Sequence, residues 1–147
     1  DSMFTAMKKY GGIGLTCNQV GLPFNMFVLG DHVGLENGLK MACFNPIIIS
    51  TGVEEVAMKE GCLTFPGLFF HVSRPEAVQV SFQDRKGEEQ ILELEGMDSR
   101  CFQHETDHLH GVLNLSYISD FKLQRAIKKR DKLVKKYANM KRSVRRV

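Results

Sequence analysis

Hydrophobic residues alternate with polar ones in two segments near the middle of this chain. Residues 77–82 and 90–94 each show this period of two, and a turn-forming segment at 84–87 separates them. A period of two is typical of strands with one buried face, so the pattern predicts a β-hairpin. Three further apolar segments predict strands over residues 26–29, 41–50 and 53–59. Pro46 lies inside one of them and predicts an edge or interrupted strand, because proline donates no ladder hydrogen bond.

Helical patterns occupy the two ends of the chain and one internal segment. Residues 2–10 have apolar positions at helical spacing, and residues 95–111 form a second predicted helix. Asp120 is the predicted N-cap of a long third helix over 121–141. The polar segment 31–37 predicts a loop. Strands in the middle with helices at the ends predict an α+β fold, and 147 residues suit a single domain.

The composition is that of a soluble globular protein, with 43% hydrophobic and 25% charged residues. No apolar run approaches the roughly 20 residues of a membrane span, so we expect no membrane partner. The first ten residues lack the apolar core of a signal peptide, and targeting stays open. The four cysteines are widely spaced without a Cys-x-x-Cys pair. This spacing favours reduced thiols, one of them available as a metal ligand, over a disulfide framework.

Positive charge is concentrated in the C-terminal segment. Residues 121–147 carry 12 Lys or Arg and one acidic residue, Asp131, which gives a net charge of +11. The rest of the chain carries 8 basic and 16 acidic residues, so the body is acidic. A basic segment of this kind attracts polyanions, of which nucleic acid is the usual one. A solvated helix with a disordered basic end is the alternative.

The segment Gln103-His104-Glu105-Thr106-Asp107-His108 has the spacing of a metal site. On a helix, His104 and His108 lie one turn apart and face the same side, so both imidazoles can bind one ion. Glu105 can lie near that ion without binding it, in the position of a general base for water. The alternative is an amphipathic helix whose histidines face solvent.

Two imidazoles need a third protein ligand. In zinc proteases of the metzincin type it is a histidine three residues after a glycine, and here that position is Asn114, so this assignment fails. Cys62 is the better candidate, because a thiolate with two imidazoles leaves one tetrahedral position open for water. Considered alone, Cys62 would be a small buried hydrophobe. His110 points elsewhere on the helix, and we expect it at the surface or behind the ligands.

Three segments of the chain match one known pattern as a set. They are Gly12-Ile13-Gly14-Leu15-Thr16-Cys17-Asn18-Gln19-Val20-Gly21, Glu60-Gly61-Cys62-Leu63-Thr64 and Gln103-His104-Glu105-Thr106-Asp107-His108. Together with the position of Arg74-Pro75, they resemble the peptide deformylase family over nearly the whole chain. The resemblance implies a central metal-binding helix packed against antiparallel β-sheets, with a long basic C-terminal helix.

The resemblance implies an enzyme that removes the formyl group from the N-terminal formylmethionine of nascent polypeptides. It implies one divalent metal ion, Fe(II) natively with Zn(II), Ni(II) or Co(II) as substitutes, held by Cys62, His104 and His108. Glu105 would move a proton from the attacking water to the leaving amine. The side-chain amide of Gln19 and the backbone N–H of Leu63 would hold the formyl oxygen, and one such donor is worth about 3 kcal/mol.

The resemblance also implies how the peptide binds. Its backbone would lie along Ile13 and Gly14 as an added β-strand, with Gly61 as a further contact. A plain tight turn is the alternative for the glycines. A methionine-sized slot with His104 at its floor is expected to be lined by Ile13, Met58, Met97 and Cys101. Ordinary core packing remains the alternative for these residues.

Two charged positions have expected roles around this site. Asp107 and Arg74 are expected to form an ion pair that braces the metal-binding helix, and the alternative for either is a plain surface charge. Arg100 stands where relatives are usually apolar, which predicts a more polar mouth of the methionine slot.

Some positions depart from the family pattern. Thr16-Cys17-Asn18 stands where relatives commonly have Ala-Ala, often followed by Pro, and Thr64 stands where Ser is more usual. These are exchanges of small residues that leave the mechanism intact. The segment that usually precedes the first helix is largely absent, as in a trimmed sequence or an unusually short member, for example a phage-borne one.

The resemblance further implies partners and a compartment. In bacterial deformylases a C-terminal helix docks on the ribosome, so residues 121–147 are expected to contact ribosomal RNA. We expect a monomer in the cytoplasm of a bacterium or of a phage's host, with an organellar origin left open. One alternative is a zinc peptidase of the His-Glu-x-x-His type, indifferent to Cys62. The other is a non-catalytic ribosome- or RNA-binding module, against which the joint presence of Gln19 and Glu105 argues.

Overall fold

The computed structural model describes residues 1–30 and 40–144, with side chains as far as residue 138. In chain order the elements are α1 (Ser2–Lys9), β1 (Gly14–Thr16), η1 (Asn18–Val20), β2 (Met26–Gly30), β3 (Lys40–Thr51), β4 (Glu55–Gly61), β5 (Phe69–Pro75), β6 (Ala77–Gln83), β7 (Glu89–Glu95), α2 (Gly96–Leu109), η3 (Asn114–Tyr117) and α3 (Asp120–Val144). The predicted α+β class is confirmed. The loop predicted over 31–37 lies outside the described residues.

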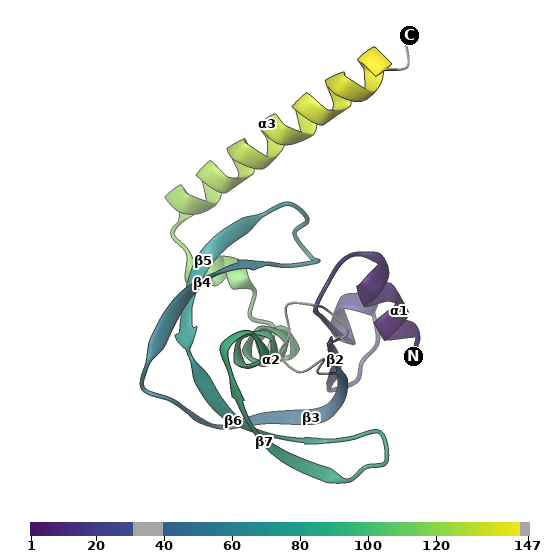
Figure 1. The fold of residues 1–147 in the computed structure, drawn as a ribbon, viewed down its shortest axis with the longest axis vertical. Helices are drawn as coiled ribbons and strands as arrows, with labels where there is room; N and C mark the ends of the chain where they lie inside the picture. Colours follow the sequence, from purple (N-terminus) through teal and green to yellow (C-terminus); the bar gives the residue numbers. More distant parts are fainter. Residues whose placement is uncertain (31–39, 145–147) are drawn as a thin grey trace.

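Two antiparallel sheets surround α2. The larger sheet has the order β1-β2-β3-β6-β7, and the smaller one pairs β4 with β5. Figure 1 shows α2 in the middle of the molecule with the strands curving around it. The predicted hairpin is confirmed as β6 and β7, which pair from Ala77–Glu95 to Gln83–Glu89. Within the described sheet β1 pairs only with β2, so its other edge is open.

The strand that contains Pro46 is central, and the prediction of an edge strand is wrong. β3 pairs with β2 on one side and with β6 on the other. The predicted interruption is confirmed, because the register of β3 on β6 shifts between Phe44 and Ile47. Asn45, just before the proline, has a φ of 49°. A bulge at this point leaves no ladder bond for proline to donate, so a central strand tolerates it.

The strand β5 has no counterpart among the predicted elements. Its buried positions alternate as Phe70, Val72 and Arg74, while the residues between them are exposed. An inward-facing arginine breaks the apolar alternation on which the prediction of strands relied. The register of β4 on β5 places Glu60 opposite Phe70.

Buried apolar side chains position α2 against the larger sheet. Phe27 and Phe102 are fully buried in the cluster between them, with ring centroids 5.0 Å apart. β2 is buried on both faces, because Phe27 belongs to this cluster while Met26 and Val28 pack with α1. Each large apolar side chain buried in this way contributes about 1.5–3 kcal/mol. The helix that carries His104 and His108 is thereby fixed in the middle of the fold.

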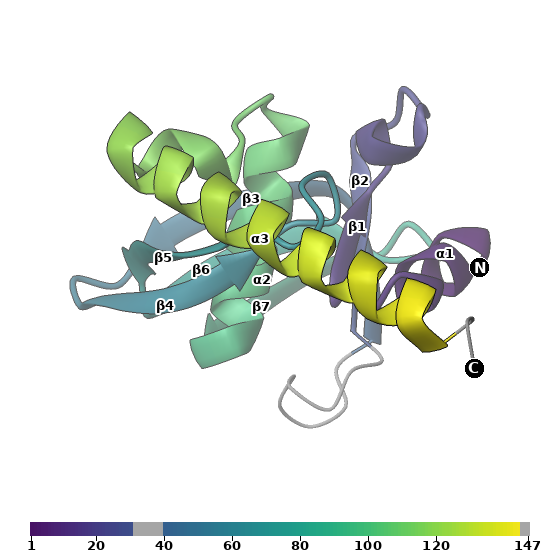
Figure 2. The same ribbon diagram turned by 90° about the horizontal axis from the view of Figure 1, so that it is seen from above.

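Among the described side chains of the long helix α3, those that pack on the body lie in its first turns. Leu123, Ala126 and Ile127 contact the cluster formed by β5 and the segment before it. Further along, Val134 and Tyr137 are 60% and 63% exposed. Figure 1 shows the C-terminal half of α3 rising away from the other elements, and Figure 2, seen from above, shows the helix running across them toward α1. Within the described parts of the chain, no helix combines the length and the apolar character that crossing a membrane requires.

Candidate metal centre and active site

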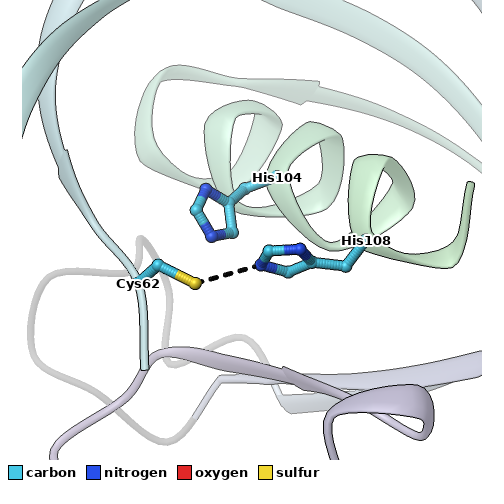
Figure 3. A group of neighbouring side chains, drawn as sticks. All are labelled: Cys62, His104 and His108. Atoms are coloured by element: carbon cyan, nitrogen blue, oxygen red, sulfur yellow. Dashed lines mark hydrogen bonds between the residues drawn. The ribbon is translucent and has the colours of Figure 1, made fainter. Parts of the chain in front are cut away.

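Cys62, His104 and His108 come together as the sequence analysis predicted. Their potential ligand atoms all lie within 4.8 Å of one another, and His108 Nε2 is 3.1 Å from Cys62 Sγ. Both histidines project from the same side of α2, and Cys62 follows the last residue of β4 (Figure 3). The centroids of the two imidazole rings are 4.7 Å apart. One ion can therefore contact all three donors.

The thiol of this donor set is ionised, as a metal ligand requires. Burial would raise the pKa of Cys62, but hydrogen bonds with His104 and His108 lower it to about 5, so the thiolate exists at neutral pH. The Nδ1 atom of His104 lies 3.0 Å from Glu60 Oε2, which leaves Nε2 to face the site. One thiolate and two imidazoles suit a divalent transition metal such as zinc or iron. The residues therefore fit the metal that the resemblance implies.

Glu60 orients His104, a role that the sequence analysis did not assign. Its buried carboxylate accepts hydrogen bonds from Arg74 Nε at 2.7 Å and from Arg100 Nη1 at 2.8 Å. Burial would raise the pKa of Glu60, but the hydrogen bonds from His104 and the two arginines lower it to about 2. The carboxylate is therefore ionised and holds the His104 ring. Its position two residues before Cys62 in an extended segment was the available signal, because such residues share a face.

The expected ion pair between Arg74 and Asp107 is present. Arg74 Nη1 lies 2.7 Å from Asp107 Oδ2, which also accepts a hydrogen bond from the Tyr117 hydroxyl at 2.8 Å. The Arg74 guanidinium lies 4.6 Å from the centre of the Tyr117 ring, within range of a cation–π contact. These contacts connect β5, α2 and η3 behind the metal ligands.

Arg100 lines the cavity, as expected of a polar residue at the slot, but most of its side chain is buried and bonded to other groups. Its side chain is buried, and Nη1 donates to Glu60 Oε1 and to the carbonyl of Val72, each at 2.8 Å. Nη2 donates to the carbonyl of Val56. The Glu60 carboxylate and the carbonyls of β4 and β5 thus hold both terminal nitrogens of the Arg100 guanidinium at the wall of the cavity.

Glu105 occupies the position expected of a general base. It is buried next to His104, and its Oε2 atom has no hydrogen-bond partner within the described part of the chain. Burial raises the pKa of Glu105 to about 7 against the opposing charges of His104 and His108. The carboxylate lies directly against Gly14, where a Cβ atom would overlap it. A carboxyl group that holds or releases a proton near neutral pH thus faces the site.

A cavity of about 390 Å³ opens beside these groups. Most of the predicted substrate contacts line it, namely Ile13, Gly14, Gln19, Gly61, Leu63, Met97 and Cys101. The predicted contact Met58 is not part of its wall. On β4 the lining residues are Lys59, Glu60 and Gly61. Met58 instead pairs with Val72 in the hairpin. The volume suits a ligand of a few residues.

Gln19 and Leu63 border this cavity beside the metal ligands. Gln19 lies in η1, and its Nε2 atom is 3.8 Å from Cys62 Sγ. Leu63 follows Cys62 directly in the chain. His110 is exposed at the end of α2, where its Nδ1 atom lies 2.8 Å from the Thr106 carbonyl oxygen. It takes no part in the cavity.

Comparisons with known proteins agree with this arrangement. The family model described as polypeptide deformylase matches residues 1–124. The peptide deformylase of Rhizobium meliloti is 38% identical over 92% of this chain and 78% of its own, and that of Saccharophagus degradans is 40% identical over 90% and 76%. The solved structure from Ehrlichia chaffeensis has a TM-score of 0.79 at 35% identity, covering 92% of this chain and 81% of its own. The structure from Synechococcus elongatus, in complex with actinonin, has a TM-score of 0.79 at 37% identity, covering 88% and 69%.

Proposed function

This chain belongs to the polypeptide deformylase family, and we propose that it removes the formyl group from the N-terminal formylmethionine of nascent peptides. The observation that carries this proposal is one cavity shared by a metal-binding donor set and a buried carboxyl group. Cys62, His104 and His108 supply the donors, and Glu105 supplies the carboxyl. Hydrolysis of the formamide bond would release formate and the free amine of the peptide.

The donor set supports a divalent ion of the first transition series. Bound by Cys62, His104 and His108, the ion would act as a Lewis acid that activates water and polarises the formyl carbonyl. We assign Fe(II) as the native metal, with Zn(II), Ni(II) and Co(II) as ions that the same mixture of sulfur and nitrogen accepts. Glu60 keeps the His104 ring oriented for binding.

Glu105 moves the proton in this reaction. As water adds to the formyl carbon, a carboxylate of Glu105 accepts one proton from that water. When the carbon–nitrogen bond breaks, the same group returns the proton to the leaving nitrogen. A pKa of about 7, raised by burial, lets Glu105 accept and donate with little difference in free energy near neutral pH.

Gln19 and Leu63 would stabilise the charge on the formyl oxygen. The Gln19 amide and the Leu63 backbone border the cavity next to Cys62. Two N–H donors in such a position stabilise a developing oxyanion more than the neutral carbonyl, which accelerates the reaction.

The open edge of β1 would hold the peptide backbone. Ile13 and Gly14 lie on the cavity side, and Gly61 lies at the end of β4. Pairing with a strand edge recognises an extended peptide with little dependence on its side chains. Met97 and Cys101 line the cavity and would contact the methionine side chain.

Formate release from a formyl-Met-Ala peptide tests the proposal. Protein loaded anaerobically with Fe(II), or with Ni(II) or Co(II), is expected to turn over the peptide. E105Q should lower kcat by about 10²- to 10⁴-fold while the bound metal is retained. C62A should lose the metal, as measured by elemental analysis.

Two results would contradict the proposal. One is the absence of formate from folded, metal-loaded protein in every metal form. The other is cleavage of internal peptide bonds that survives C62A, which would identify a peptidase of the His-Glu-x-x-His type. Salt-sensitive RNA binding without any turnover would favour a non-catalytic module instead.

We also propose that α3 contacts ribosomal RNA. The support is its charge and its placement, because basic residues follow one another along a helix whose C-terminal half extends from the body (Figure 1). The affinity of such phosphate contacts falls as the salt concentration rises, because binding releases counterions from the RNA.

Co-sedimentation with ribosomes at several salt concentrations tests this contact. The double variant K132Q/K136Q should lower the affinity and reduce the slope of log K against log salt by about 1.5–2, near one unit for each phosphate that the protein no longer neutralises. K9Q/K86Q removes two charges elsewhere and should leave binding unchanged. Equal effects of both variants, or binding independent of salt, would exclude a specific role for α3.

A further inference from the structure

Two threonines occupy three of the four hydrogen-bonding positions of the Gln19 side-chain amide. A glutamine amide has an oxygen with two lone pairs and a nitrogen with two N–H groups. Oε1 accepts hydrogen bonds from the backbone N–H and from the hydroxyl of Thr16, both at 2.9 Å. Nε2 donates to Thr64 Oγ1 at 3.0 Å. The remaining N–H of Nε2 makes a long hydrogen bond of 3.8 Å to Cys62 Sγ, which directs it toward the metal site, where a formyl oxygen would replace the sulfur as its acceptor.

Thr16 determines which way the amide faces. A backbone N–H can only donate, so the Gln19 atom next to Thr16 N must be the oxygen. The flipped amide would place two donors against each other. Thr16 is completely buried on β1, so no water competes for these bonds. The nitrogen of Gln19 is consequently directed toward the cavity.

Thr64 connects this amide to the metal ligand. Its hydroxyl accepts a hydrogen bond from Gln19 Nε2 at 3.0 Å and keeps its own proton to donate, and hydrogen bonding with Thr64 is among the causes that lower the pKa of Cys62. The donors then run in one direction, from Thr16 through Gln19 and Thr64 to Cys62. The orientation of each group in this series of hydrogen bonds is therefore set by the group before it.

Resting on the proposed function, we propose that Thr16 is a positioning residue that holds the Gln19 amide with one N–H aimed at the formyl oxygen. Thr64 acts as the second support of the same amide. Thr16 does not line the cavity, so it acts through Gln19 rather than on the peptide. Its hydroxyl contributes to the chemical step and leaves peptide binding unchanged.

A double-mutant cycle on formate release tests this role. T16V removes the hydroxyl and keeps the shape, and it should lower kcat about three- to tenfold, as expected for the removal of one hydrogen bond, with KM within about twofold. T16S should restore kcat. Q19L should lower kcat about 100-fold or more. In the Q19L background T16V should have no further effect, because residues that act through one group are not additive.

T106V is the matched control. Thr106 is a buried threonine whose hydroxyl has no hydrogen-bond partner in the described part of the chain. Its replacement should leave kcat unchanged. Wild-type kcat in T16V, or an equal loss from T16V in both backgrounds, would overturn the inference. If T16V does not fold, the same cycle with T64V and T64S tests whether the threonines hold the Gln19 amide. Thr64 is exposed, so its replacement should not prevent folding.

A spectroscopic measurement separates this inference from the proposed function. In zinc-loaded protein labelled with ¹⁵N, the Gln19 side-chain amide gives two proton signals, identified by their absence in Q19L. T16V should shift or broaden them and T16S should restore them. Unchanged signals in T16V would overturn the positioning role of Thr16, even if the enzyme is active. Absence of formate from the wild type would instead overturn the proposed function and leave this measurement decisive for Thr16.

Discussion

Gly14 has no side chain because Glu105 occupies the space where one would be. A Cβ atom there would overlap the Glu105 carboxylate. We therefore expect G14A to displace Glu105 and lower kcat at least tenfold. The overpacked strand should also lose about 1–3 kcal/mol of unfolding free energy. Steady-state kinetics and denaturant unfolding of the metal-loaded variant measure the two effects.

G52A is the control for this substitution. A Cβ atom on Gly52 would meet its nearest neighbour, the Ala77 carbonyl oxygen, at 3.4 Å, which is an ordinary contact. Activity should stay at the wild-type level. Wild-type kcat in G14A with full metal content would show that Glu105 does not need its present position.

Glu60 is the second residue on which the site depends. E60Q removes the negative charge beside two buried arginines, Arg74 and Arg100, and we expect a loss of about 3–5 kcal/mol in unfolding free energy. The affinity for metal should fall about 10- to 100-fold, because His104 loses its orienting partner. Urea unfolding and competition with a metal chelator measure these changes.

E55Q supplies the comparison on the same strand. Glu55 is exposed and accepts a hydrogen bond from Ser73 Oγ at 3.0 Å. Its replacement should change stability by less than about 0.5 kcal/mol. Metal affinity unchanged in E60Q would mean that His104 is held by its helix alone.

At the scale of elements, the bulge in β3 allows a proline inside the larger sheet. Asn45 adopts the left-handed conformation there, with a φ of 49°. N45V should destabilise the protein by about 1–2 kcal/mol, since a β-branched residue is strained in this conformation. N45G should be tolerated better because glycine adopts it freely. Thermal unfolding of both variants checks this, and equal losses would argue that the Asn45 side chain, rather than its backbone, matters.

At the scale of the whole molecule, α3 has a packed half and an exposed half. Removal of residues 133–147 deletes side chains that are exposed where described, so we expect unchanged kcat and a stability change below about 1 kcal/mol. Ribosome binding should weaken, since six of the basic residues are removed.

Removal of residues 118–147 is the contrasting truncation. It deletes Leu123 and Ile127, which pack on the cluster that contains Phe70 and Val72. Stability should fall by about 2–5 kcal/mol, because the partly buried apolar side chains of α3 and the cluster that they cover both lose their packing. Equal stability of the two truncated proteins would show that α3 contributes nothing to the fold.

Local spacing accounts for what the sequence by itself determined. Two histidines four residues apart share one side of any helix, and alternating residues share one face of any strand, so the ligand pair and the β6–β7 hairpin were predicted without the fold. The need for a third ligand pointed to Cys62, the resemblance supported it, and the structure brings it to the pair. Gly14, Gln19 and Leu63 came from the same segments and reach the same cavity.

Only the tertiary structure decided contacts between segments far apart in the chain. Arg100 bonds to Glu60 across 40 residues, so its burial was invisible in a local pattern. The place of β3 in the sheet depends on which strands lie beside it, and a proline limits only its own hydrogen bond. Met58 is paired with Val72 in the β4–β5 hairpin, and the cavity wall on β4 begins at the next residue. Periodicity specifies the side of an element, while packing against distant elements specifies what that side meets.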